Sequence, residues 1–393
     1  MRFSDRAQSI APFFAMHFGQ RAAALEAQGH RVIKLSLGEP DFGAPPQVIS
    51  AMQMALSDTP MPYTSALGLP PLRQAIARYY AAAYDLEIDQ ARVVVTAGAS
   101  AALLLVTAAL VNPGDEVLVG DPSYPCNRQF LASFGAQVKL VPTSSSTRYQ
   151  LDAALVREHW SERTRGLMVA TPNNPTGTSV PARELAAICE WTRAQDAWRI
   201  VDEIYLGLTD VDAADRPTRS VLSVDAGAVV INSFSKYFGM TGWRLGWCVV
   251  PLEMVPVLER IAQNYYICPS TLAQHAALEC FKPETLAICE ARRVELAGRR
   301  SLVLQGLSRI GLPVPVSPDG AFYVYFSVAH TGLDAMQFCE RALAEAHVAL
   351  TPGNDFGQCT AADHVRLSFA ASSEELSEGL NRLGRFVAQF EHA

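Results

Sequence analysis

Short runs of β-branched and aliphatic residues alternate with longer segments of helical periodicity through the middle of the chain. Seven of these runs are predicted strands, at residues 92–96, 116–119, 137–141, 166–170, 199–201, 229–232 and 245–250. Several are apolar at consecutive positions, which is typical of strands that helices cover on both faces. The pattern therefore predicts an α/β fold built on a mostly parallel seven-stranded sheet flanked by helices.

The order of elements changes after residue 283. A long helical pattern covers 284–310, and two strands (321–326 and 365–369) and two helices (334–346 and 373–391) follow it. This is an α+β pattern, and 393 residues exceed the roughly 250 to 300 at which a single core usually stops growing. We expect a large domain at 46–283 and a smaller α+β domain formed by 1–45 and 284–393, with an N-terminal arm across both.

Charge and composition exclude several classes of partner. The net charge is −7 and no basic block occurs, which argues against a nucleic-acid partner. The eight cysteines form no C-x-x-C and the histidines have no metal-ligand spacing, so we expect neither disulfides nor a metal. The most apolar segment, 97–111, is shorter than the roughly 20 residues of a membrane span. A reduced, cytoplasmic protein with small-molecule partners is the expectation.

Lysine usage marks one residue for chemistry. Only four of the 32 basic residues are lysines, and one of them, Lys236, follows the apolar run 229–231 directly after Ser233-Phe234-Ser235. A guanidinium stays protonated, whereas a desolvated amine can lose its proton and condense with a carbonyl. A lone lysine is more often a surface residue, so the neighbouring motifs must decide.

Small and hydroxylated residues close to this lysine are typical of a phosphate site. The turn at 98–100 follows the strand 92–96 and begins a helix, where free N–H groups and the helix dipole favour an anion. Ser233, Ser235 and Arg244 add two hydroxyls and a fork-shaped cation. A phosphate beside a reactive amine indicates pyridoxal phosphate.

Other strand ends supply what such a cofactor requires. Its ring is an electron sink only while the pyridine nitrogen is protonated, and Asp202, directly after the strand 199–201, could hold that proton. Tyr205 and Asn174 could hydrogen-bond a ring substituent, and Tyr124 could stack on the ring. Taken alone, Asp202 could be a helix cap or turn former, and the segment around Asn174 could be a structural turn.

Together these motifs resemble the class I aminotransferases of the fold-type I pyridoxal phosphate family. The resemblance runs from about Gly38 to Arg366 and rests on the segments Ser233–Lys236 with Arg244, Asp202–Tyr205, Asn174–Gly177 and Tyr63–Gly68. It implies that Lys236 is the Schiff-base lysine, that Asp202 binds the pyridinium nitrogen, and that Tyr205 and Asn174 bind the ring oxygen. The phosphate ligands that it implies are Ala99, Ser100, Ser233, Ser235 and Arg244, below a ring stacked on Tyr124.

The resemblance also implies the substrate site and a homodimer. Arg366 matches the arginine that binds the substrate α-carboxylate, and Gly38 and Asn174 line the same site. Tyr63 matches a tyrosine that reaches the phosphate of the partner subunit. The expected activity is amino transfer from an amino acid to a 2-oxo acid by a ping-pong mechanism.

Three alternatives to an aminotransferase stay open to different degrees. Carbon–sulfur β-lyases of the same fold share nearly all of these residues. A non-catalytic cofactor-binding regulatory domain lacks, in this chain, the basic segment that DNA binding would need. The S-x-x-K of penicillin-recognising serine enzymes fits residues 233–236, but S-D-N and K-T-G are absent from the sequence.

The amino donor is expected to be neutral, either apolar or aromatic. Ser100 carries no charge where some relatives that prefer dicarboxylic substrates place a lysine, and Arg366 is expected to bind the α-carboxylate. A further set of aromatic residues is a candidate either for the pocket or for the core: Phe13, Phe14, Phe18 and Tyr266.

Overall fold

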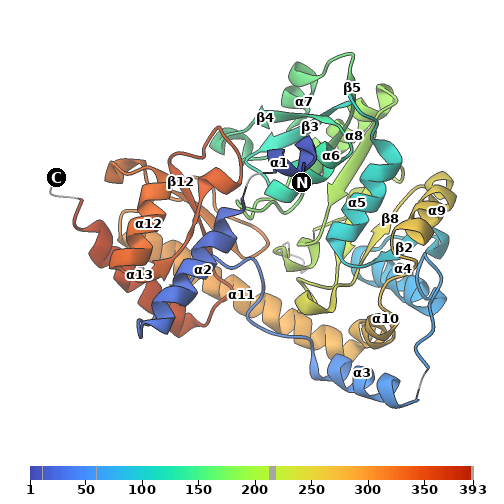
Figure 1. The fold of residues 1–393 in the computed structure, drawn as a ribbon, viewed down its shortest axis with the longest axis horizontal. Coiled ribbons are helices and arrows are strands. Elements are labelled where there is room, and N and C mark those ends of the chain that lie inside the picture. The colour runs from blue at the N-terminus through green and yellow to red at the C-terminus, as the bar shows by residue number, and fades with distance from the viewer. Residues whose placement is uncertain (11, 59, 212–217, 391–393) are drawn as a thin grey trace.

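The computed structural model describes residues 1–10, 12–58, 60–211 and 218–390. Figure 1 shows a large lobe, in which helices surround a central sheet, beside a smaller lobe that contains the C-terminus. The long helix α11 (Pro283–Arg309) runs from one lobe to the other along one side of the molecule. No helix in the described ranges is long and apolar enough to cross a bilayer.

The central sheet has seven strands in the order β2-β8-β7-β6-β5-β3-β4. Their bounds are β2 (Val93–Thr96), β3 (Glu116–Asp121), β4 (Gln137–Pro142), β5 (Thr164–Ala170), β6 (Trp198–Asp202), β7 (Val229–Ser233) and β8 (Gly246–Val249). Neighbouring strands are parallel except in the two pairs that β8 makes. The predicted mostly parallel, seven-stranded sheet is confirmed, and each predicted strand overlaps an observed one.

Helices cover both faces of this sheet, which explains its continuous apolar runs. Along β2, Val93 and Val95 pack in one hydrophobic cluster, whereas Val94 packs in the other. The first cluster includes residues of α4 (Pro70–Tyr84) and α8 (Ala182–Ala194), and the second includes residues of α5 (Ala99–Leu110) and α9 (Val255–Tyr265). A strand buried on both faces needs an apolar residue at every position.

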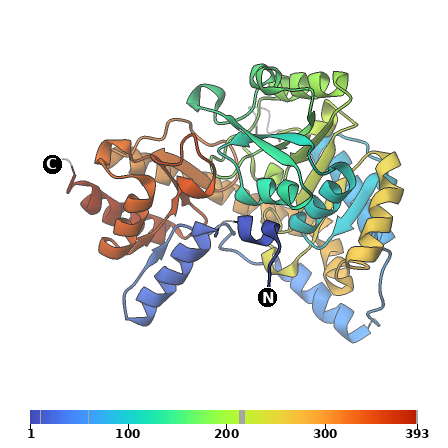
Figure 2. The same ribbon diagram turned by 45° about the horizontal axis from the view of Figure 1, so that its top comes forward.

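Four further α-helices belong to the large lobe. They are α3 (Pro46–Asp58), α6 (Pro125–Ser133), α7 (Ala153–His159) and α10 (Thr271–Ala277). Figure 2 shows α3 at the lower edge of the large lobe, well away from the small lobe that holds the C-terminus.

The small lobe contains two small sheets. One is antiparallel, in the order β11 (Thr351–Pro352), β12 (His364–Ser368) and β9 (Tyr323–Ser327). The other pairs β1 (Ile33–Lys34) in parallel with β10 (Val348–Ala349). The helices α12 (Ala335–Glu345) and α13 (Ser373–Val387) begin after Asp334 and Ser372, whose side chains cap the first turns. The predicted α+β pattern is observed, but three strands of two residues each were too short to predict.

The N-terminal arm touches both lobes. Helix α1 (Asp5–Ser9) lies near the large lobe, where Arg6 Nη1 donates to the carbonyl of Ser133 at 2.7 Å. Helix α2 (Phe14–Ala27) packs against β10 and β11 of the small lobe. These contacts, and the start of α11 at Pro283, support the division into 46–283 and 1–45 with 284–393, which we propose as the domain boundaries.

Candidate active site

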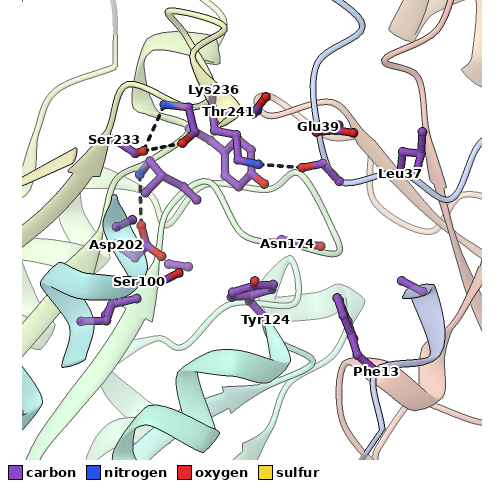
Figure 3. A pocket seen from close by; sticks show the side chains of 18 of the residues that line it. Phe13, Leu37, Glu39, Ser100, Tyr124, Asn174, Asp202, Ser233, Lys236 and Thr241 are labelled. Atoms are coloured by element: carbon purple, nitrogen blue, oxygen red, sulfur yellow. Dashed lines mark hydrogen bonds between the residues drawn. The ribbon is translucent and has the colours of Figure 1, made fainter. Parts of the chain in front are cut away.

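The carboxyl ends of the parallel strands meet at one edge of the sheet, and a cavity of about 770 Å³ opens there. Because β8 is antiparallel, its first residue lies at the same edge: Gly246 pairs with both Thr96 and Ser233. Twelve of the thirteen residues predicted for the site line this cavity, namely Gly38, Ala99, Ser100, Tyr124, Asn174, Asp202, Tyr205, Ser233, Ser235, Lys236, Arg244 and Arg366. Figure 3 labels some of them, namely Ser100, Tyr124, Asn174, Asp202, Ser233 and Lys236.

One end of the cavity is built from the start of α5 and the loop after β7. Ser233 Oγ donates to Ser235 Oγ at 2.9 Å and accepts from the backbone N–H of Ser235 at 3.0 Å. A side chain at Gly98 would place its Cβ 2.6 Å from Nη2 of Arg244, so only glycine lets the guanidinium lie against the first turn of α5. Gly98 also has a φ of 87°, which glycine adopts without strain. Amides, hydroxyls and a cation thus converge on one point.

Lys236 projects its amine into the middle of the cavity. Nζ donates to the carbonyl of Gly38 at 2.6 Å and lies 5.8 Å from the ring centroids of Tyr205 and Phe322. Burial lowers the pKa of Lys236 to about 8, and the nearby carboxylate of Glu39 opposes that shift. A substantial share of this amine is therefore neutral at mildly alkaline pH.

Asp202 ends β6 on the opposite side of the cavity from the lobe boundary. Its side chain is buried, and Oδ1 accepts from the backbone N–H of Ile204 at 3.1 Å. Burial raises the pKa of Asp202 to about 7, although that hydrogen bond and the charge of Lys236 both lower it. No cation among the described residues forms an ion pair with this carboxylate, so a cationic ligand would relieve its desolvation.

Arg366 on β12 is a buried cation of the small lobe that lines the cavity. It is only 1% exposed, and its guanidinium donates to Ser36 O at 2.7 Å, Asn174 Oδ1 at 2.9 Å and Thr351 Oγ1 at 3.2 Å. Its Nε has no partner in the part of the chain that the structure describes. No described carboxylate forms an ion pair with Arg366, so a buried positive charge is left without a direct counter-ion.

Aromatic side chains enclose the space between these groups. Tyr124 lies at the start of α6, across the cavity from Lys236, and Phe13 meets its ring edge-on at 6.5 Å. Tyr205 is buried, with its hydroxyl 2.8 Å from that of Tyr323. A flat ligand would fit beside Tyr124 with its polar edges toward Asp202, Tyr205 and the Ser233 loop.

The apolar part of the cavity lining was only partly predicted. Residues of the N-terminal arm and of α5 supply it, namely Phe13, Ala15, Met16, Leu37 and Leu103. The arm is held there because the buried carboxylate of Asp355 accepts from the backbone N–H groups of Phe14 and Ala15 at 2.7 and 2.8 Å. Glu39, Ser36 and Thr241 also line the cavity and were not predicted. Glu39 and Thr241 lie within motifs around predicted residues, but no pattern indicated Ala15 or Met16.

Three of the aromatic candidates lie outside the pocket. Of the four, Phe13 alone lines the cavity; Phe18 is fully buried in the core, and Phe14 and Tyr266 pack against the two hydrophobic clusters. Core packing, the ordinary role of an aromatic residue, accounts for these three.

Tyr63 does not reach the cavity of its own chain. Its side chain is 78% exposed, which is high for a tyrosine, while the segment around it is anchored. Thr271 Oγ1 donates to the carbonyl of Pro62 at 2.8 Å, and Gln274 Nε2 donates to Thr64 Oγ1 at 3.1 Å.

Comparison with known proteins identifies the family. The family model of aminotransferase class I and II matches residues 30–383. The chain is 39% identical to a valine–pyruvate aminotransferase of Mycobacterium tuberculosis, covering 96% of this chain and 97% of that one. It is 35% identical to an arginine–pyruvate transaminase of Pseudomonas aeruginosa, with 99% of both chains covered.

Solved structures give the same result. An aminotransferase from Mycobacterium tuberculosis matches with a TM-score of 0.95 and 39% identity, over 99% of this chain and all of that one. Aspartate aminotransferase from Thermus thermophilus with maleate matches with a TM-score of 0.91 and 34% identity, over 98% of this chain and all of that one. The chain belongs to the class I and II aminotransferases and has their fold-type I architecture.

The lowered pKa of Lys236 predicts a distinct reactivity. In protein freed of bound carbonyl compounds, reductive methylation at pH 8 should modify Lys236 at least about tenfold faster than any other lysine, since an ordinary lysine with a pKa near 10.4 is almost fully protonated there. Lys34 and Lys282 are engaged in ion pairs with Glu26 and Glu279. Peptide mapping over time measures the four rates, and equal rates would contradict the prediction.

Proposed function

We propose that this aminotransferase binds pyridoxal phosphate through Lys236 and transfers the amino group of a neutral amino acid to a 2-oxo acid. The proposal rests on one observation: three charged or ionisable side chains line the same cavity. It contains an amine of lowered pKa on Lys236, a buried carboxylate without a cation on Asp202, and a buried cation without a carboxylate on Arg366. Each lacks the partner that such a cofactor or its substrate would provide.

The end of the cavity beside α5 suits the phosphate. Ala99 and Ser100 lie in the first turn of α5, whose free N–H groups favour an anion. Ser233, Ser235 and Arg244 offer hydroxyl and guanidinium donors, the pairing that phosphate monoesters prefer. The close approach of Arg244 to Gly98 supports this reading, because a Cβ would fill the place where these donors converge.

The middle of the cavity suits a pyridine ring. A protonated ring nitrogen would give Asp202 the counter-ion that it lacks, and Tyr124 offers a flat apolar surface for stacking. Tyr205 Oη can donate to a ring oxygen. Asn174 can do so as well, since its Oδ1 already accepts from Arg366 and leaves its Nδ2 as a donor.

When bound, the cofactor supplies an electron sink for charge that develops at the substrate α-carbon. Arg366 binds the α-carboxylate with the guanidinium edge that carries its unpaired Nε, and Gly38 borders the same place. Lys236 Nζ takes up the proton from the α-carbon, for which a pKa close to working pH is suited. We infer a ping-pong sequence, in which the first 2-oxo product leaves before the second substrate binds.

The proposed donor is neutral because the wall facing the substrate side chain is apolar. Phe13, Ala15, Met16, Leu37 and Leu103 form it, and Ser100 carries no charge. An acidic side chain there would lose water without gaining a cation, at a cost of several kcal/mol. The relative named for valine and pyruvate supports an apolar donor.

We further propose a homodimer in which Tyr63 completes the phosphate site of the partner subunit. An anchored segment that directs a 78% exposed tyrosine away from its own chain supports the proposal. A cytoplasmic location is also proposed, since all eight cysteines are free.

Removing the amine of Lys236 should abolish amino transfer. We expect Lys236→Ala to lower transamination by roughly 10³-fold or more, because both the covalent attachment and the proton carrier are lost. Lys139→Ala, a lysine whose Nζ donates to His159 O, is the matched control and should keep its activity. Borohydride reduction of the wild type followed by peptide mapping locates the attachment, and a pyridoxyl label on Lys34, Lys139 or Lys282 would refute it. Pyruvate and ammonia released from a cysteine conjugate faster than amino transfer would favour the β-lyase alternative.

The apolar wall predicts donor preference. With a common 2-oxo acid acceptor, kcat/KM for valine, leucine or phenylalanine should exceed that for aspartate by about a hundredfold, the factor expected for an unpaired buried carboxylate. Met16→Lys should reduce this ratio by adding a cation to the wall. Met54→Lys is a control of matched exposure (65% against 64%) on α3, outside the cavity, and should leave the ratio unchanged. A wild-type preference for aspartate would overturn the proposal.

Composite sites predict a particular result for mixed subunits. When Tyr63→Phe and Lys236→Ala chains are co-expressed with different tags, one site of each hybrid dimer should carry both changes and the other neither. Purified hybrids should therefore show about half of the wild-type activity per dimer. Fully active monomers in sedimentation at assay concentration would contradict the homodimer.

A further inference from the structure

Tyr323 lies directly behind the cavity and touches three of the groups that line it. It is on β9 with 0% exposure and does not itself line the cavity. Its hydroxyl is 2.8 Å from that of Tyr205, and its ring lies 4.5 Å from Cζ of Arg366. A Cβ on Gly38 would lie 3.3 Å from the Tyr323 hydroxyl, so the missing side chain of Gly38 leaves space for this approach.

The two tyrosine hydroxyls form an isolated pair. Among the described residues, neither Oη has a hydrogen-bond partner except the other. Burial raises the pKa of Tyr205 well above its ordinary value and raises that of Tyr323 as well, so both stay protonated over the working pH range. The two hydroxyl groups therefore carry two protons, but a single hydrogen bond joins their oxygens. One proton lies between them, and the other must point elsewhere.

The direction of this hydrogen bond decides what Tyr205 offers the cavity. If Tyr205 donates to Tyr323, its proton points away from the cavity. If Tyr323 donates to Tyr205, the Tyr205 proton is free to point at a ligand, because Tyr205 lines the cavity and Tyr323 does not. A donor to a hydroxyl oxygen also polarises its O–H group and strengthens the bond that it donates in turn.

We propose that Tyr323 is a positioning residue that donates to Tyr205 and thereby directs the Tyr205 proton to the ring oxygen of the cofactor. This inference rests on the proposed function and deepens it. The ring of Tyr323 also packs against the guanidinium of Arg366. Phe356 is a second aromatic neighbour of this cation, with its ring centroid 5.0 Å from Cζ of Arg366. One side chain thus holds the cofactor contact through its hydroxyl and the carboxylate contact through its ring.

The hydroxyl and the ring can be tested separately. In the holoenzyme, a weaker bond from Tyr205 leaves more negative charge on the ring oxygen, which then holds the neighbouring Schiff-base proton more tightly. Tyr323→Phe should therefore raise the pH midpoint of the visible absorption change by about 0.2 to 0.5 units, and Tyr205→Phe should raise it by about 1 to 2 units. Tyr323→Phe keeps the ring under Arg366, so KM for the amino acid should stay near wild type, whereas Tyr323→Leu should raise it.

Two controls separate this role from a merely structural one. Tyr325→Phe removes another buried hydroxyl from β9, one that bonds Thr360 Oγ1 at 3.0 Å, and should leave the midpoint unchanged. In Tyr205→Phe, adding Tyr323→Phe should cause no further shift, because Tyr323 acts through Tyr205. A Tyr323→Phe midpoint equal to wild type, beside a shifted Tyr205→Phe, would overturn the inference alone. Wild-type protein without any visible absorption after incubation with pyridoxal phosphate would overturn the proposed function, and this inference with it.

Discussion

The active-site region depends on the burial of one positive charge, that of Arg366. Keeping a guanidinium at 1% exposure is costly unless its donors are engaged. Backbone and side-chain oxygens from three separate segments engage them: Ser36 from the arm, Thr351 from β11 and Asn174 from the large lobe. These contacts satisfy hydrogen bonds but leave the charge uncompensated. The same interactions that join arm, small lobe and large lobe thus hold a buried cation that the carboxylate of a ligand would neutralise.

Asp202, which lines the same cavity, is the opposite case: a buried carboxylate without a paired cation among the described residues. A buried carboxylate without a cation and a buried cation without a carboxylate can coexist in a stable fold because each has neutral hydrogen-bond partners, and burial also raises the pKa of Asp202. Lys236 lines the same cavity, and burial lowers its pKa as well. A cofactor with a cationic ring nitrogen would neutralise Asp202, and a substrate carboxylate would neutralise Arg366. The groups that would provide binding energy would then also be the groups that take part in the chemistry.

The sheet and the groups at its edge could be predicted from the sequence, because both depend on local patterns. Continuous apolar runs define strands covered on both faces, and Asp202 and Ser233 directly follow such runs. The apolar wall could not be predicted, because Ala15 and Met16 reach the cavity only through the bonds from the arm to Asp355, some 340 residues away. Tyr323 was missed for a similar reason: its strand was predicted, but its pairing with Tyr205 depends on how the two lobes meet.

The groups that could be predicted and those that could not come from different parts of the fold. The groups that we propose for the cofactor come mainly from strand ends of the large sheet, whereas most of those that we propose for the substrate come from the arm and the small lobe. Met16 lines the cavity but forms no hydrogen bond with Lys236 or Asp202 among the described residues, so a substitution there changes the apolar lining most directly. Relatives of this chain at 34–39% identity carry names with valine, arginine or aspartate as substrate, although all match it over nearly their full length. The shared architecture therefore does not by itself fix the substrate, which depends on the groups that line the cavity.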